Sequence, residues 1–387
     1  MTLKGIEMNK VNIVNCLLTR KCNLSCSYCR ISGDMHYITK PREYPNRSWY
    51  FENEKDTEWW IDAVTRLHKH NPEVFFILYG GEPFIRWELL ADLVNYMNAN
   101  DMNYTIISSC NEGIQKLIYK FFDKVEYVKG FTASIDPGFY KIELKGRREM
   151  SDDEAYKSHT GFKMLKELMD KGLVKDPVAE ITCDYKTIFD LEETCKKLTE
   201  LGITADVTTL DLAHNNYYDF SSIDSTEALV HPTDEVRAVF KRLKESDYLI
   251  HMKEYLMDAI PDKLLPSKLR CNIGTDHLSN LTIEPTGELR LCLRIRGRFV
   301  PKYQLTDLID KDGNMTSPED KSRWLHRSPC GIEEGNKPID ISECDIVTFP
   351  TKIEAAFSAD YESLCKGCCW TCMLMTMSDD CQGIINH

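Results

Sequence analysis

Short apolar segments that alternate with amphipathic ones dominate the N-terminal part of the sequence. Six of the apolar segments are rich in β-branched residues, and they cover positions 11–18, 74–79, 104–108, 131–135, 178–183 and 205–210. Helical spacing characterises the segments between them, such as "GFKMLKELMDKG". In that segment Phe162, Leu165, Leu168 and Met169 share one face, and Gly172 is a natural stop. The pattern predicts strands separated by helices.

Strands that are apolar throughout and are separated by helices are typical of a parallel sheet buried on both faces. Six β/α units predict an α/β fold, either a partial (β/α)6 TIM-like barrel or an open sheet, with functional loops at the C-terminal strand ends. Periodicity is lost after about residue 260, where "IPDKLLPSK" indicates a connection. The predicted domains are therefore 1–260 and 261–387, and "LTIEPTGELRLCL" in the second domain predicts a β-hairpin.

Three cysteines follow the first predicted strand directly. The stretch "CNLSCSYC" contains Cys22, Cys26 and Cys29 within eight positions. Thiolates are soft ligands that select zinc, copper(I) or iron–sulfur clusters, and a structural zinc needs a closed set of four ligands. Three thiolates on a four-iron cluster leave one iron open to a substrate or cofactor. A zinc site completed by a distant histidine is the alternative.

This motif, with the aromatic Tyr28 before its last cysteine, resembles the cluster motif of the radical S-adenosylmethionine (SAM) superfamily. The resemblance implies a partial barrel in which Cys22, Cys26 and Cys29 hold a [4Fe-4S] cluster. It further implies that S-adenosyl-L-methionine binds the open iron. One electron from the cluster would then cleave SAM to methionine and a 5′-deoxyadenosyl radical, which abstracts hydrogen from a substrate.

A second landmark, "LYGGEPF", follows the second predicted strand. Gly80 and Gly81 permit close backbone approach, and Glu82 supplies a charged acceptor for an ammonium group. The stretch resembles the Gly-Gly-Glu-Pro motif with which the family holds the amino group of SAM. The resemblance thus makes Gly80, Gly81, Glu82 and Pro83, together with Tyr28 of the cysteine motif, predicted cofactor contacts.

The next two predicted strands end in polar residues that are weaker candidates. "SSCNEG" and "SIDPG" resemble segments that family members place near the cofactor. The resemblance makes Ser109, Asn111, Ser134 and Asp136 candidate contacts to the SAM ribose or carboxylate. Turn formation by Asn, Asp, Pro and Gly explains these residues nearly as well.

The C-terminal part holds nine of the 16 cysteines. Cys271 and Cys292 flank the predicted hairpin, and "LCKGCCWTCMLM" follows much later. A hairpin pair followed by a distant Cys-x2-Cys is a common way to close a metal site. The segment resembles the auxiliary-cluster extensions called SPASM and twitch, in which a hairpin with the pattern of Ile283, Pro285 and Gly287 precedes a cysteine.

The late cysteines are more compressed than in the full SPASM pattern, which binds two clusters. One auxiliary [4Fe-4S] cluster is therefore predicted, with Cys271, Cys292, Cys365 and Cys368 as ligands and Cys372 as a rival for either late position. The alternatives are a zinc knuckle and a second cluster that would use Cys330, Cys344, Cys372 or Cys381. The three middle cysteines, Cys110, Cys183 and Cys195, are predicted to be small buried apolar residues.

The amino-acid composition indicates which binding partners and which cellular location to expect for the protein. The net charge of −13, from 61 acidic and 48 basic residues, disfavours broad binding to a nucleic-acid backbone. The longest apolar run, "VFFILY", is far shorter than the roughly 20 residues of a membrane span, and the N-terminus lacks the pattern of a signal peptide. A cytoplasmic enzyme without membrane contact is expected, and the resemblance implies a reductant such as flavodoxin or ferredoxin.

The resemblance implies an oxidoreductase or maturase whose substrate is a peptide or protein side chain, or a small natural-product intermediate. A nucleotide or nucleic acid is a third alternative. Two rival classes are a non-catalytic protein stabilised by zinc or an iron–sulfur cluster, and an electron-transfer protein like a ferredoxin. No catalytic acid, base or hydrogen donor is assigned, because buried structural roles explain the candidates His36, Tyr37, Cys183 and Asp184.

Overall fold

The described part of the chain is built around one sheet. A computed structural model describes residues 11–24, 53–141, 153–185, 187–209, 233–251, 253, 256, 280–287, 289–290 and 305–314. Its eight strands have the order β6-β5-β4-β3-β2-β1-β7-β8. Their bounds are β1 Ile13–Leu17, β2 Phe75–Tyr79, β3 Asn103–Ser108, β4 Val128–Ser134, β5 Val174–Cys183, β6 Thr204–Thr209, β7 Asn280–Ile283 and β8 Leu289–Arg290.

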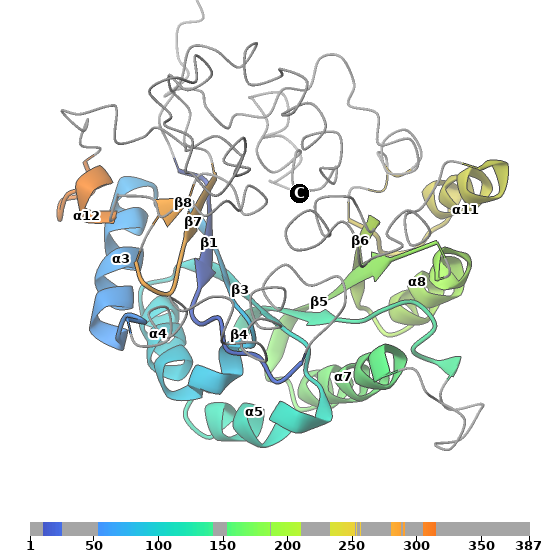
Figure 1. The fold of residues 1–387 in the computed structure, drawn as a ribbon, viewed down its shortest axis with the longest axis horizontal. Helices are drawn as coiled ribbons and strands as arrows, with labels where there is room; N and C mark the ends of the chain where they lie inside the picture. The colour runs from blue at the N-terminus through green and yellow to red at the C-terminus, as the bar shows by residue number, and fades with distance from the viewer. Residues whose placement is uncertain are drawn as a thin grey trace, which may run out of the picture.

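Helices follow most of the strands. They are α3 Thr57–His70, α4 Trp87–Ala99, α5 Gln115–Phe122, α7 Asp153–Asp170, α8 Leu191–Thr199, α11 Asp234–Glu245 and α12 Leu305–Leu308, with the 3₁₀-helices η1 Pro83–Arg86, η2 Glu112–Ile114 and η3 Ile188–Asp190. Figure 1 shows α3, α4, α5, α7 and α8 along the outer side of a curved sheet. All pairings from β6 through β1 to β7 are parallel, so the predicted partial TIM-like barrel is confirmed.

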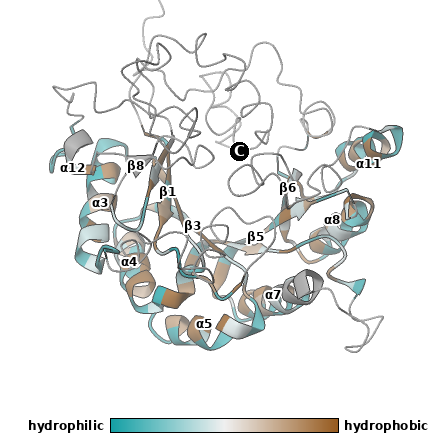
Figure 2. Cartoon of the chain, viewed as in Figure 1, coloured by the Kyte–Doolittle hydropathy of each residue, from teal (hydrophilic) through white to brown (hydrophobic). Residues whose placement is uncertain are grey.

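Local sequence explains where the helices begin and end. Asp56 caps α3, because its carboxylate accepts a 2.9 Å hydrogen bond from the backbone N–H of Trp59. The helix α7 ends before Gly172, as predicted, and α8 ends in the same way before Gly202; these glycines have φ angles of +69° and +73°. Figure 2 shows that the outer helices carry hydrophilic as well as hydrophobic residues, as expected for helices with one face toward solvent.

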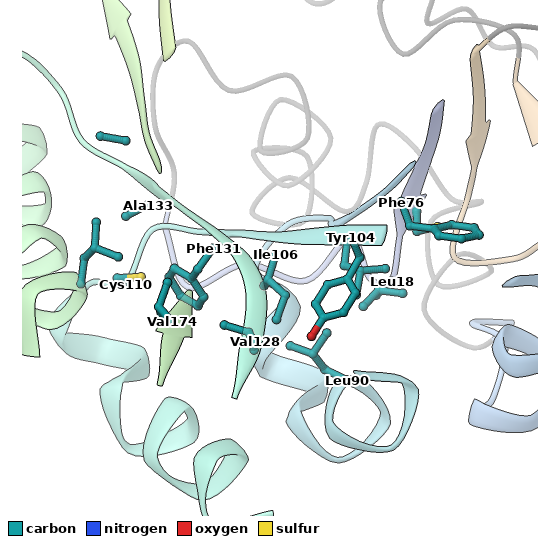
Figure 3. Packing of buried hydrophobic residues seen from close by; sticks show 14 of the residues in the cluster. Leu18, Phe76, Leu90, Tyr104, Ile106, Cys110, Val128, Phe131, Ala133 and Val174 are labelled. Carbon is teal, nitrogen blue, oxygen red and sulfur yellow. The ribbon is translucent and has the colours of Figure 1, made fainter. Parts of the chain in front are cut away.

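The core lies between the sheet and the outer helices. Alternate strand residues point to it, so Phe76, Leu78, Tyr104 and Ile106 are at most 1% exposed. Figure 3 shows Tyr104 and Ile106 with Leu90 of α4 on this side of the sheet. The residues between them, such as Ile77, are half-buried and face the inner side of the barrel.

The predicted hairpin is present and belongs to the same sheet. β7 and β8 pair antiparallel, and β7 also pairs parallel to β1, with Cys16 opposite Ile283. Residues 305–314 pack on α3, where the Arg66 guanidinium donates to the carbonyl of Ile309 at 3.2 Å. The predicted boundary at residue 260 and all C-terminal cysteines lie outside the described residues. In the part that is described, no helix is long and apolar enough to cross a membrane.

Candidate functional site

The segment that leads into the three-cysteine motif runs beside the Gly-Gly segment. After β1 and β2 end, the pairing continues through Leu18 N–H to Tyr79 O at 2.8 Å, Gly81 N–H to Thr19 O at 2.7 Å and Glu82 N–H to Lys21 O at 2.8 Å. Residues 18–24, called the cysteine loop below, are thereby fixed along residues 79–82. The sequence predicted both segments at C-terminal strand ends, and the structure places them in direct contact.

The two glycines are required by this contact. A Cβ atom on Gly80 would lie 2.2 Å from the carbonyl oxygen of Thr19, and one on Gly81 would lie 2.2 Å from that of Lys21. Such distances are far below van der Waals contact, so only glycine permits the approach. The sequence predicted close approach to a ligand here, and the structure adds close approach to the cysteine loop.

Glu82 is buried at the end of β2, with 1% of its surface exposed. Its Oε1 accepts hydrogen bonds from Ser108 Oγ at 2.9 Å and Phe84 N–H at 3.3 Å. Its Oε2 accepts from Ser109 N–H at 3.1 Å and Ser109 Oγ at 2.9 Å. Burial raises the pKa of this carboxyl, and the four donors act in the opposite direction. Glu82 also caps η1, whose first residue is the buried Pro83.

A turn after β3 brings the next candidates to the same place. Cys110 has a φ of +51°, which is uncommon for a residue other than glycine. Around this turn, Asn111 Nδ2 donates to Ser109 Oγ at 2.6 Å. Asn111 also forms a reciprocal amide pair with Asn23 of the cysteine loop, at 2.9 and 3.4 Å. With Gly113 N–H bound to its Oδ1 at 2.9 Å, the Asn111 amide is fully engaged within the protein.

The described part of the three-cysteine motif is Cys22, which is half-buried. Its Sγ accepts a 3.4 Å hydrogen bond from the backbone N–H of Leu24. Cys26, Cys29 and Tyr28 lie outside the described residues. Among the residues that are described, no group of three potential metal ligands comes together. A half-buried thiol on a fixed loop suits a soft metal, so Cys22 fits the predicted role.

Sequence reasoning missed a set of charged residues around the cysteine loop. Arg20 donates to Glu284 Oε2 from Nε at 3.0 Å and from Nη2 at 2.6 Å, and both side chains are almost fully buried. Glu54 accepts from Thr19 Oγ1 at 2.6 Å. Arg20 lies three residues beyond the end of β1 and is buried, so its charge requires a compensating partner. The sequence does not identify which acid supplies it.

Arg86 at the end of η1 holds the base of the same loop. Its guanidinium donates to the carbonyls of Leu18 at 2.8 Å and Lys55 at 2.7 Å. Burial lowers the pKa of this arginine, and the nearby carboxylates of Glu54 and Asp56 act in the opposite direction. The carbonyl of Leu18, just after β1, and that of Lys55, just before α3, thus each receive a side-chain donor.

The remaining candidates lie farther along the sheet. Ser134 is half-buried at the end of β4. Asp136 follows it, and both its backbone N–H and its carboxylate are bonded to Ser158 Oγ, at 2.9 and 3.2 Å. Cys110, Cys183 and Cys195 are fully buried, as predicted, and burial raises the pKa of each thiol.

One connected group of residues therefore lies at the ends of β1, β2 and β3. It consists of Cys22, Gly80, Gly81, Glu82, Ser109 and Asn111. The group combines a soft thiol, a buried carboxylate and hydroxyl and amide groups held in place by one another. Such a rim, above the inner side of a partial barrel, can hold a metal centre beside a polar ligand.

Comparison with known proteins adds to this geometry. No family model matches the sequence, and no curated protein matches it. The chain is similar to the structure of native anSMEcpe with bound AdoMet and Cp18Cys peptide, at 12% identity and a TM-score of 0.50, covering 97% of this chain and 98% of that one. It is also similar to Streptococcus suis SuiB bound to S-adenosylmethionine, at 12% identity and a TM-score of 0.47 over 74% of this chain.

The chain spans 61% of the length of the SuiB structure. The likeness to anSMEcpe extends over nearly the whole of both chains and shows a shared fold. The fold that the resemblance implied, a partial TIM-like barrel, is thus confirmed.

Proposed function

We propose that this chain is a radical SAM enzyme, which cleaves S-adenosylmethionine reductively and abstracts hydrogen from a substrate. The observation that carries the proposal is the contact between the cysteine loop and the Gly-Gly-Glu segment. Two motifs that are 50 or more residues apart meet at one rim, and the fold is that of a protein with bound AdoMet. A zinc-stabilised binding module would leave the open three-thiol site unexplained, because a structural zinc takes a closed set of four ligands.

In this proposal Cys22, Cys26 and Cys29 hold a [4Fe-4S] cluster and leave one iron for SAM. When bound, the cluster supplies the electron for cleavage of the sulfonium. The chain's own residues orient the cofactor. Glu82 supports its ammonium group, while Ser109 and Asn111, fixed by Glu82 and Asn23, shape the adjoining polar wall.

The proposed substrate is a peptide or protein side chain, and the enzyme is of the oxidoreductase or maturase type. The anSMEcpe structure, which shares the fold, was determined with a bound peptide, and this supports the peptide over a small natural product. The charge of −13 supports the same choice over a nucleic acid. A low-potential protein such as flavodoxin or ferredoxin is proposed as the electron donor.

We further propose that residues 261–387 bind one auxiliary [4Fe-4S] cluster. Its proposed ligands are Cys271, Cys292, Cys365 and Cys368, with Cys372 as the rival. The β7–β8 hairpin supports this assignment, because it brings the chain to Cys292 just two residues beyond the end of β8. A fully ligated cluster would relay an electron, since it has no open position for a substrate.

Iron content and SAM cleavage test the proposal together. Replacing Cys22, Cys26 and Cys29 by alanine should lower the iron content of the anaerobically prepared protein from about eight to about four per chain. It should also abolish 5′-deoxyadenosine formation under dithionite, because partial ligand sets do not retain a cluster.

The matched control is the double variant Cys183→Ala/Cys195→Ala, which removes thiols buried away from the loop. This control should retain the full iron content and cleave SAM. If the triple variant still forms 5′-deoxyadenosine at the native rate, the motif is not the site of cleavage and the proposal is wrong.

A further inference from the structure

The cysteine loop is held differently on its two sides. On the side of β2, three backbone hydrogen bonds continue the pairing from Leu18 to Glu82. On the side of β7, the ladder between β1 and β7 ends at Cys16 and Ile283. Beyond that point a pair of hydrogen bonds from Arg20 to Glu284 joins the two segments. The Arg20 side chain thus connects the two segments beyond the last backbone pairing of β1 with β7.

This ion pair is buried and directional. The Arg20 and Glu284 side chains are 5% and 2% exposed, and two N–H groups of the guanidinium converge on one carboxylate oxygen. A buried pair of this kind is strongly unfavourable to break from one side, because the remaining charge stays in a poorly solvated place. The loop therefore has a steep energetic preference for the position in which Arg20 reaches Glu284.

The hairpin holds Glu284 at a fixed place. The residue directly follows β7, and its carbonyl accepts the turn hydrogen bond from Gly287 N–H at 2.8 Å. The next residue, Pro285, accepts a 2.7 Å hydrogen bond from the backbone N–H of Lys55. Because the hairpin is anchored to both β1 and residue 55, Glu284 can act as a rigid support for Arg20.

We propose that Glu284 is a positioning residue that holds the cysteine loop through Arg20, so that the β7–β8 hairpin forms part of the site at the loop. Arg20 lies two residues before Cys22, and its position fixes the direction in which the loop leaves the sheet. What the loop binds rests on the proposed function, but its dependence on Glu284 does not.

Hydrogen exchange of the full-length, metal-free chain tests this dependence directly. In Glu284→Gln, the amides of residues 18–24 and 79–82 should exchange about tenfold faster or more than in the wild type, because the local opening becomes easier. The amides of β4 and β5 should be unchanged. No change at the loop, or an equal acceleration everywhere, would overturn the proposal, since the pair would then be irrelevant or a general stabiliser.

Asp62→Asn is the matched control, because it removes the carboxylate partner of another buried arginine. Arg66 Nε and Asp62 Oδ2 lie 2.7 Å apart on α3, and the Arg66 side chain is 7% exposed. The control should loosen α3 and leave the loop unchanged, and equal loosening of the loop would contradict the proposal. Should Glu284→Gln fail to fold, Arg20→Lys gives the same readout, because it keeps the charge and loses the two-pronged contact.

A second readout uses iron. Iron-loaded Glu284→Gln should release iron to a chelator faster than the wild type, again by about tenfold. If the wild type binds no iron, the proposed function fails while the exchange result still decides the role of Glu284. If iron is bound and both exchange and release are unchanged in the variant, the positioning role fails and the proposed function stands.

Discussion

Glu82 and Ser109 share two hydrogen bonds, because one carboxylate oxygen accepts from both the hydroxyl at 2.9 Å and the backbone N–H at 3.1 Å of the serine. This relationship ties the end of β2 to the turn after β3. Through Ser109 Oγ and Asn111 it extends to Asn23 of the cysteine loop. The buried carboxylate therefore organises three strand ends, whatever it contributes to a ligand.

Removing this carboxylate tests both roles. Glu82→Ala should weaken AdoMet binding by roughly ten- to a hundredfold, since a charge-assisted hydrogen bond contributes about 1.5–3 kcal/mol. Iron content should be retained. Equilibrium dialysis of the iron-replete variant measures the affinity, and Ser108→Ala, which removes one donor from the same carboxylate, should have a smaller effect. Unchanged affinity in Glu82→Ala would mean that the residue serves only the turn.

Stability should respond to the pH through Glu82. Burial raises the pKa of the Glu82 carboxyl in the folded chain above its ordinary value of 4.5. At pH values between 4.5 and this raised pKa, the folded chain therefore binds more protons than the unfolded chain. The free energy of unfolding of the wild type, measured against Glu82→Gln by urea denaturation, should therefore fall as the pH rises through this window and then level off. A difference that rises with pH would mean that the four donors outweigh burial.

Alanine at Gly81 should be poorly tolerated. Its Cβ would meet the carbonyl oxygen of Lys21 at 2.2 Å, and overpacking of this kind costs at least about 2–3 kcal/mol. Gly202→Ala is the control, because nothing lies within 4 Å of its Cβ and only its positive φ is unfavourable, by about 1–2 kcal/mol. Urea denaturation measures both. Equal losses would show that the cysteine loop can move away from Gly81.

Asn111→Asp should lower both stability and affinity for AdoMet, although asparagine and aspartate are nearly the same size. The variant loses the donors to Ser109 and Asn23 and places a second negative charge near Glu82. We expect a loss of stability of about 1–2 kcal/mol and a weaker affinity for AdoMet. Asn98→Asp is the control, since Asn98 donates to the Tyr127 carbonyl far from the loop. If both variants bind AdoMet equally, the effect of Asn111 is not local.

The proposed auxiliary cluster has its own test. Replacing Cys271 and Cys292 together should leave SAM cleavage measurable, because the first cluster is intact, and should stop substrate conversion. Circular dichroism and thermal melting distinguish lost electron transfer from misfolding of a metal-stabilised segment. Product formation at the native rate by a folded variant that lacks this cluster would rule out the relay role.

Much of the fold is predictable because it is locally encoded. The six strands and the helices that end at Gly172 and Gly202 follow from apolar runs and glycine stops, and the hairpin follows from its Pro-Thr-Gly turn. The pairing of β7 with β1 could not be predicted in this way, since both are short apolar strands and nothing in either sequence identifies its partner.

The sequence predicts candidate residues of the site, but it does not predict the hydrogen bonds and ion pairs between them. The motifs and the family resemblance made Cys22, Glu82, Ser109 and Asn111 candidates. They did not show that the Asn111 amide is hydrogen-bonded to other groups of the protein. The contribution of Glu284 was missed, because it follows an ordinary hairpin strand and acquires its role only from the position of Arg20.

The parallel pairing of Cys16 with Ile283 also has a consequence for the order of events on the ribosome. β1 is synthesised well before β7, because 267 residues separate these two paired positions. At about 5–20 residues per second, β1 would wait roughly 15–50 s with one edge open. During that interval the nascent chain exposes an apolar strand edge, which is prone to aggregation until β7 pairs with it.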